Sequence, residues 1–177
     1  DYARSLPVFQ ELMTGAAGKP RTLVPDAEFH AAQCQYHLGQ TKEAVKRFNI
    51  IVQKYPGTPF ALEAQVFVGD HLLEQGDFDR AVTTYEQALK DFPGSEKTDL
   101  IYYELGQAYQ AMGKFERALD YYKRIPKTAA KEIFAKAQLA VADIFSKKEE
   151  DAVSALKSYQ TIAETVPEFK RDAYAKI

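Results

Sequence analysis

Apolar residues recur three and four positions apart along most of the chain, which is the spacing of one face of an α-helix. The pattern is clearest over residues 62–93, where it appears in two halves joined at Gly76 and Asp77. Val68 and Leu72 mark the apolar face of the first half. Two helices joined by a short turn are therefore predicted for this stretch.

This pair of helices recurs with a period of 37 residues (76 minus 39, and 113 minus 76). The repeating columns are a turn glycine at Gly39, Gly76 and Gly113, an alanine at Ala44, Ala81, Ala118 and Ala155, and an aromatic residue at Phe48, Tyr85, Tyr122 and Tyr159. A period of this size indicates an all-α solenoid of stacked helix pairs, in which each repeat contacts only its neighbours.

The period divides the chain into four repeats flanked by two partial ones. The predicted segments are the second helix of a truncated repeat at 2–13, repeats at 25–57, 58–94, 95–127 and 128–167, and the start of a further helix at 168–177. Because both ends fall inside the pattern, we expect a single solenoid domain that is a fragment of a longer chain. Pro7 would disrupt a helix interior, so the first helix could instead begin near Pro7.

Polar residues, glycines and prolines mark the expected helix boundaries. Asp26 and Thr41 are predicted to cap the two helices of the first repeat, and Gly39 is predicted to end the first of them. Pro59 suits the first turn of the next helix. The long first helix of the fourth repeat is expected to begin at Thr128.

Two glycines lie inside predicted helices, where glycine costs about 1 kcal/mol relative to alanine. We expect Gly69 and Gly106 to let the second helix of each repeat approach the first closely, because glycine has no Cβ. The aromatic column should fill the space between repeats. For these columns a structural role is favoured over a ligand site.

The pattern L-G-x-x-Y, then G, A-x-x-x-F/Y and P, resembles the tetratricopeptide repeat. The third repeat matches it at Leu105, Gly106, Tyr109, Gly113, Ala118 and Tyr122, and the second at Val68, Gly69, Leu72, Gly76, Ala81, Tyr85, Ala88 and Pro93. The first repeat departs from it at Ala32 and Gln35, and the fourth lacks the turn glycine. The resemblance implies a right-handed superhelix of antiparallel helix pairs that acts as a non-catalytic protein-interaction scaffold.

Composition narrows the function further. The net charge of −2 does not suggest general attraction to nucleic acid or anionic lipid. No apolar run approaches the roughly 20 residues that span a bilayer, so this fragment is not expected to insert into a membrane. The single cysteine, Cys34, excludes an internal disulfide and a cysteine-based zinc site.

No set of residues forms a recognisable active site. His30 and His37 are seven residues apart on one helix, which places their Cα atoms roughly 10 Å apart, too far to share one metal ion without a third element. Residues 15–20 have two glycines and a lysine but lack the Ser/Thr and the preceding strand of a phosphate-binding loop. We therefore predict no catalytic residue, no metal and no cofactor.

The resemblance implies that the first helix of each repeat lines a concave groove that binds a protein or peptide segment. The predicted groove residues are Phe29, Val66, Tyr103 and Leu139 at the fifth position, Gln33, Asp70, Gln107 and Asp143 at the ninth, and Tyr36, Leu73, Gln110 and Ser146 at the twelfth. The alternative is that part of the apolar column belongs to the core. Asp70 and Asp143 are expected to face solvent and to favour a partner that carries a Lys or Arg beside its apolar anchors.

The connectors at 55–59 and 92–95 resemble those of bacterial envelope members of the family, such as the Tol-Pal coordinator protein and the lipoprotein of the outer-membrane-protein assembly machine. This likeness implies a periplasmic or outer-membrane-associated protein; the other possibility is the cytoplasm. Two further functions stay open. One is self-association through open repeat ends, which light scattering against concentration would reveal. The other is a regulatory arm of an enzyme whose catalytic part lies outside this fragment.

Overall fold

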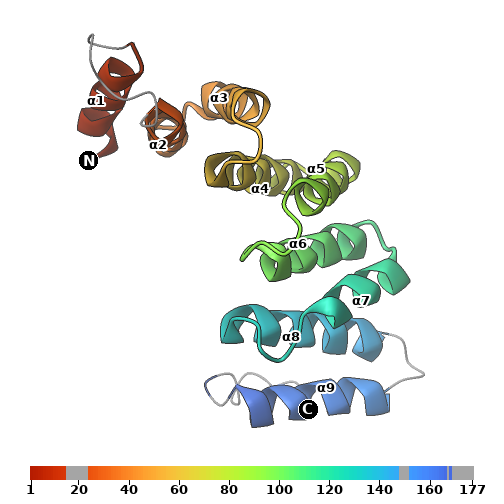
Figure 1. Ribbon diagram of the computed structural model, residues 1–177. Helices are drawn as coiled ribbons and strands as arrows, with labels where there is room; N and C mark the ends of the chain where they lie inside the picture. The colour runs from red at the N-terminus through yellow and green to blue at the C-terminus, as the bar shows by residue number, and fades with distance from the viewer. Residues whose placement is uncertain (15–23, 148–151, 167, 169–177) are drawn as a thin grey trace. The chain divides into compact units, whose positions relative to one another are not determined.

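The computed structural model describes residues 1–14, 24–147, 152–166 and 168. These residues form nine helices and no strand, which confirms the all-α prediction (Figure 1). The helices are α1 (Tyr2–Thr14), α2 (Val24–His37), α3 (Thr41–Lys54), α4 (Pro59–Glu74), α5 (Phe78–Asp91), α6 (Thr98–Ala111), α7 (Phe115–Arg124), α8 (Lys131–Lys147) and α9 (Ala152–Thr165). The predicted loop before the first repeat, over 15–23, and the predicted further helix over 169–177 lie outside the described residues.

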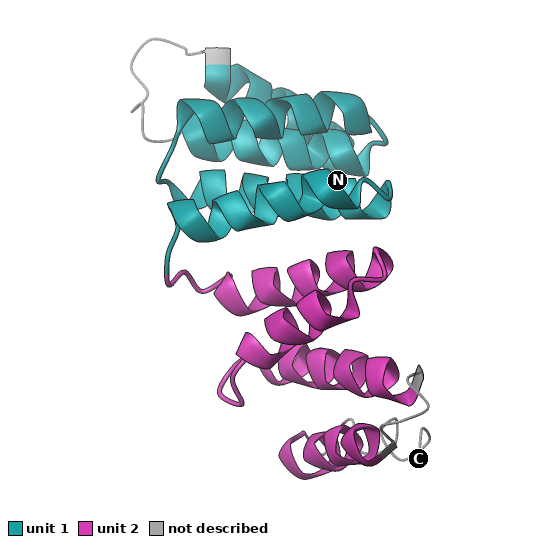
Figure 2. Cartoon of the chain, turned by 90° about the vertical axis from the view of Figure 1, so that its right-hand side faces the viewer, with its two compact units in different colours: residues 1–93 teal, residues 94–177 magenta. Residues whose placement is uncertain are grey.

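The helices form two compact units, residues 1–93 and residues 94–177, shown in teal and magenta in Figure 2. In unit 1 each helix from α1 to α5 packs on the next, and α2 also contacts α4. In unit 2 each helix from α6 to α9 packs on the next, and α6 also contacts α8. Contact between successive helices, and between the first helices of adjacent repeats, is the packing of a helix-pair repeat. The continuity of both units in one solenoid stays a prediction.

The turn glycines end the first helices as predicted. Gly39, Gly76 and Gly113 have φ of 78°, 74° and 71°, a left-handed conformation that only glycine adopts readily. After α2, Gly39 donates its N–H to the carbonyl of Tyr36, and Gln40 donates to that of Gln35. These bonds satisfy the last carbonyls of the helix and turn the chain into the second helix of the repeat.

α1 runs through Pro7, so the alternative of a helix that begins near Pro7 is wrong. The turn before the proline is closed by hydrogen bonds from the N–H groups of Arg4 and Ser5 to the carbonyl of Asp1. It also has a tertiary contact, since the ring of Tyr2 stacks on that of His37 with centroids 4.2 Å apart. Packing against α2 thus supports helix where the proline alone would disfavour it.

Two of the predicted caps are wrong. α2 begins at Val24, ahead of Asp26, whose carboxylate instead lies 3.0 Å from Nε2 of His30 one turn later. α3 begins at Thr41 itself, and no side chain caps it. By contrast, the hydroxyl of Thr58 caps α4 by accepting the N–H of Ala61 at 3.3 Å, and a proline occupies the first position of α4 as predicted.

α8 begins at Lys131 instead of Thr128. The cause is the turn that follows Pro126, in which Ala129 donates its N–H to the carbonyl of Pro126 at 3.0 Å. The residues of this turn are committed to a bond between positions three apart, so the helix starts only after them.

Gly69 and Gly106 face the rings of Tyr85 and Tyr122. A Cβ placed on either glycine would lie under 3.0 Å from three atoms of the facing ring, closer than real Cβ contacts. Both tyrosines are fully buried. The predicted close approach of the two helices is therefore confirmed for the second and third repeats, where the ring lies between the two helices of one repeat. All four residues of the aromatic column are buried.

Candidate partner-binding site

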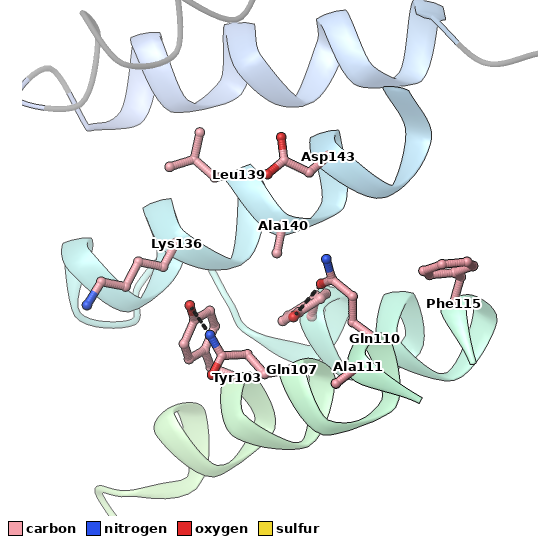
Figure 3. Close-up of a pocket in the computed structure, with 10 residues that line it drawn as sticks. Tyr103, Gln107, Gln110, Ala111, Phe115, Lys136, Leu139, Ala140 and Asp143 are labelled. Atoms are coloured by element: carbon pink, nitrogen blue, oxygen red, sulfur yellow. Dashed lines mark hydrogen bonds between the residues drawn. The ribbon is translucent and has the colours of Figure 1, made fainter. Parts of the chain in front are cut away.

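A cavity of about 580 Å³ opens between α6 and α8 in unit 2 (Figure 3). We call it the α6–α8 pocket; its lining residues are Tyr103, Gln107, Gln110, Ala111, Phe115, Tyr122, Lys136, Leu139, Ala140 and Asp143. Among them are five predicted groove residues, Tyr103, Gln107, Gln110, Leu139 and Asp143. The structure therefore brings together the predicted set of the third and fourth repeats, except for Ser146, which is exposed and donates to the carbonyl of Asp143.

Helical spacing explains why these residues meet. Tyr103, Gln107 and Gln110 are separated by four and three positions, so they share one face of α6. Leu139 and Asp143 are four apart and share one face of α8. Because α6 and α8 pack against each other, these two faces border the same space (Figure 3).

Two glutamine side chains leave complementary polar groups in the pocket. The amide nitrogen of Gln107 donates to the hydroxyl oxygen of Tyr103 at 2.7 Å, and the hydroxyl of Tyr122 donates to the amide oxygen of Gln110 at 2.9 Å. The oxygen of Gln107 and the nitrogen of Gln110 have no hydrogen-bond partner among the described residues. One can accept and the other can donate, which matches the N–H and C=O of a peptide backbone.

Both tyrosine hydroxyls of the pocket stay protonated near neutral pH. Burial, and then the charge of Glu104, raise the pKa of Tyr103 against the opposing effects of Lys136 and Gln107. Burial raises the pKa of Tyr122 far above its usual value. The hydroxyl of Tyr122 is thus committed as a donor to Gln110, and that of Tyr103 keeps its proton for a ligand.

Lys136 also lines the pocket, although it is not among the groove residues predicted from the sequence. Its ammonium group lies 2.6 Å from a carboxylate oxygen of Glu132, and this hydrogen bond raises the pKa of Lys136. The sequence could have indicated it, because Lys136 is three positions before Leu139 and therefore lies on the same face of α8. Its charge means that the pocket offers a cation as well as the carboxylate of Asp143.

In unit 1 the predicted groove residues divide between core and surface. Phe29 and Val66 are only 6% and 5% exposed, so their prediction as contact residues is wrong and the core alternative holds for them. Phe29 packs against Phe48 and Phe60, with ring centroids 5.5 and 5.8 Å away. The aromatic side chains of the neighbouring helices cover this position, which is half-exposed at Tyr103 in unit 2.

Three other predicted residues of unit 1 are half-buried. Gln33 bonds to the ring of His30 at 2.8 Å, and Leu73 lies near the end of α4. Tyr36 lines a separate cavity of about 460 Å³ together with His37 and His71.

Asp70 and Asp143 were expected to face solvent, but both bind the aromatic column. The hydroxyl of Tyr85 donates to Asp70 at 2.5 Å, and that of Tyr159 donates to Asp143 at 3.3 Å. Each carboxylate is half-buried and ties the first helix of its repeat to the second. The prediction that both residues face solvent is therefore wrong.

Metal-binding residues, a reactive cysteine or a membrane-spanning helix would indicate another kind of site in the described part of the chain. It holds no cluster of three or more His, Cys, Asp or Glu side chains placed to bind a metal ion. His30 and His37, considered as ligands from the sequence, contact Asp26 and Tyr2 instead. Cys34 is buried, and burial raises the pKa of its thiol. None of the described helices has both the length and the apolar character to cross a membrane.

The fold and the pocket define a helical-repeat protein of the kind that binds other protein chains. Two sequence profiles of the tetratricopeptide repeat match it, one over residues 26–58 and one over residues 60–125, and together they span more than half of the chain. The chain belongs to the tetratricopeptide repeat family. Members of this family bind protein partners, so the chain is a protein-interaction scaffold in class.

Solved structures share this fold at low sequence identity. A crystal structure of MamA has a TM-score of 0.75 and 14% identity, covering 97% of this chain and 92% of that one. The structure of MamA 41-end from Desulfovibrio magneticus RS-1 has a TM-score of 0.71 and 17% identity, and the match covers 94% of this chain and 86% of that one. The structure of TTC0263, a thermophilic TPR protein from Thermus thermophilus, has a TM-score of 0.60 and 18% identity, and the match covers 99% of this chain and 90% of that one. No curated protein matches the sequence.

Proposed function

We propose that this chain is a non-catalytic scaffold that binds an extended segment of a partner protein in the α6–α8 pocket. The observation that carries the proposal is that five residues, chosen from two repeats by helical position, line one cavity. A scaffold needs no reacting group, and the pocket offers apolar surface and hydrogen-bonding groups instead.

The lining specifies the partner segment. Leu139, Phe115 and the ring of Tyr103 offer apolar contact area. Gln107 and Gln110 suit one peptide unit of an extended backbone. Asp143 favours a Lys or Arg side chain, as expected from the sequence, and Lys136 adds a preference for a nearby acidic or carbonyl group. Charge should act mainly on the rate of encounter and the choice of partner.

We place this scaffold in a bacterial cell-envelope complex, in the periplasm or associated with the outer membrane. The support is the resemblance of the connectors at 55–59 and 92–95 to those of envelope members of the family. Fractionation of the source cells, with detection of the protein by antibody, tests this part of the proposal, and a purely cytoplasmic signal would contradict it.

Photo-crosslinking locates the binding surface even when the partner is unidentified. A benzophenone amino acid at Leu139 should capture a partner protein from an extract of the source cells. The same amino acid at Asp120, exposed on α7 and outside the pocket lining, is the matched control and should not. Capture at position 120 but not at 139 would show that the pocket is the wrong surface.

Tyr103→Ala should weaken binding of the captured partner by about tenfold, because it removes an aromatic ring from the pocket lining. The loss should be similar at low and high salt, since it comes from contact area. Tyr102→Ala is the matched control, an adjacent tyrosine outside the pocket lining. Titration calorimetry measures the affinities and circular dichroism the folding of both variants. Equal affinities for the two variants would reject the pocket.

A further inference from the structure

Positive charge is concentrated in unit 2 at the end of α7, in the connector that follows it and at the first residue of α8. Residues 121–131 contain four cations and no Asp or Glu, although the whole chain has a net charge of −2. We call Lys123, Arg124, Lys127 and Lys131 the basic connector patch; all four are exposed. Apart from Lys131, none of them makes an ion pair with another described residue.

The backbone that carries these cations is held in place from both sides. Ile125 is 3% exposed, and Ala129 packs partly buried against the same core. Between them, the hydrogen bond from Ala129 to the carbonyl of Pro126 closes a turn, and Lys127 occupies the second position of this turn. The patch is therefore presented by an ordered backbone, which lowers the entropic cost of binding.

Arg124 is oriented by aromatic rings. Its guanidinium carbon lies 4.8 Å from the ring centroid of Tyr121 and 5.7 Å from that of Tyr102. Stacking over ring faces holds a guanidinium flat and leaves its N–H edges available. A carboxylate is the planar acceptor that fits such an edge with two parallel hydrogen bonds.

Lys131 occupies an electrostatically unfavourable position in its helix. It occupies the first position of α8, where the helix dipole disfavours a cation. Its described partner is Glu168, at 3.9 Å, with side chains 71% and 54% exposed, which is a weak pair. This contact shows that a carboxylate of the chain itself already reaches the patch.

Favourable interaction with a helix dipole explains only two of the four cations of the basic connector patch. Lys123 and Arg124 lie in the last turn of α7, where cations suit the helix dipole. The same dipole argument fails for Lys131 and does not apply to Lys127 in the turn. Cations that bring no benefit to the local fold point to a ligand of opposite charge.

We infer that the basic connector patch binds an acidic segment of a partner protein, independently of the α6–α8 pocket. Lys123 and Lys131 are eight positions apart, so the patch extends at most about 29 Å. An extended segment of about eight residues with several Asp or Glu would cover it. A long polyanion is disfavoured, since attraction is confined to about 8 Å at physiological ionic strength and the rest of the chain is negative.

The test uses fluorescence anisotropy of the full chain with a labelled ten-residue peptide of alternating Glu and Ser. The peptide should bind, and its Gln–Ser counterpart should not. Lys127→Gln and Arg124→Lys should each weaken binding about threefold to tenfold, the second because it keeps the charge but loses the planar fork. Lys90→Gln, an exposed lysine of unit 1, is the charge-matched control and should leave the affinity unchanged.

Glu168→Gln should strengthen binding of the acidic peptide, because it removes the competing carboxylate from Lys131. Glu164→Gln, with the same charge change on α9, should not. Tyr103→Ala should have no effect, which separates this inference from the pocket. Circular dichroism verifies that each variant is folded. The inference is overturned by absence of peptide binding, by equal weakening with Lys90→Gln, by unchanged binding with Arg124→Lys, or by tighter binding of a uridine oligonucleotide or of phosphatidylserine vesicles.

Discussion

Gly106→Leu is expected to lower the free energy of unfolding by about 3 kcal/mol or more, because it overpacks the close contact between α6 and Tyr122 of α7. The new side chain would enter space already filled by the fully buried ring of Tyr122, where even a Cβ lies under 3.0 Å from ring atoms. A displaced Tyr122 ring would also strain or lose its hydrogen bond to Gln110. Urea unfolding followed by circular dichroism measures the difference.

Two controls make this result specific. Gln110→Leu lies four positions along α6 and faces the pocket, so it should cost less than Gly106→Leu even though it loses the bond to Tyr122. Gly106→Ala should lie between the parent and the leucine variant. The fourth repeat tolerates alanine in this column, since Ala142 occupies the corresponding place 36 residues after Gly106 and is itself fully buried. Equal unfolding midpoints for Gly106→Leu and Gln110→Leu would contradict the helix register.

The core could be predicted from the sequence because it rests on contacts that recur. The spacing of Gly106 from Tyr122 equals that of Gly69 from Tyr85, so the two repeats report the same geometry independently. A glycine that is costly inside a helix, paired at constant distance with a large aromatic residue, has few explanations other than close packing. The turn glycines were predictable for a similar reason, since their left-handed backbone restricts the residue type.

The groove was predicted less well because one helix position can serve different purposes in different repeats. The fifth position is core at Phe29, under neighbouring aromatic side chains, but pocket surface at Leu139. Helical periodicity gives the direction of a side chain, whereas burial depends on what the adjacent helices place over it. Hydrogen bonds such as that from Tyr85 to Asp70 join residues fifteen positions apart, and a one-dimensional pattern does not contain that geometry.

The period also relates two polar pairs in unit 1. The ammonium of Lys54 lies 2.7 Å from the carboxylate of Glu28, and the amide nitrogen of Gln65 donates to the carboxylate of Asp91 at 3.0 Å. Glu28 and Gln65 are 37 residues apart (65 minus 28), as are Lys54 and Asp91 (91 minus 54). In both repeats the end of the second helix contacts the first helix of the same repeat. This contact is an ion pair in one repeat and a hydrogen bond from an amide to a carboxylate in the next.

Lys54→Asp is therefore expected to lower the free energy of unfolding by about 2 to 3 kcal/mol, less than for a fully buried pair because Lys54 is half-exposed. The side chain of Glu28 is 12% exposed and would lose its cation and face a second carboxylate instead. Lys46→Asp, the same charge change at an exposed site on α3, is the control and should cost under about 1 kcal/mol.

Adding Glu28→Gln to Lys54→Asp should restore most of the lost stability, because the double variant reproduces the pair that Gln65 and Asp91 make in the next repeat. Aspartate at position 54 should be long enough to reach a glutamine at position 28, since Asp91, one period after position 54, accepts a hydrogen bond from Gln65. The stabilities of parent, both single variants and the double variant form a double-mutant cycle, and a coupling energy of about 2 kcal/mol is expected for groups in contact. A double variant as unstable as Lys54→Asp alone would show that the two repeats are not equivalent at this position. The aromatic contacts around Phe29 and Phe60, which have no counterpart between the same positions of the next repeat, would then be the first place to look for the cause.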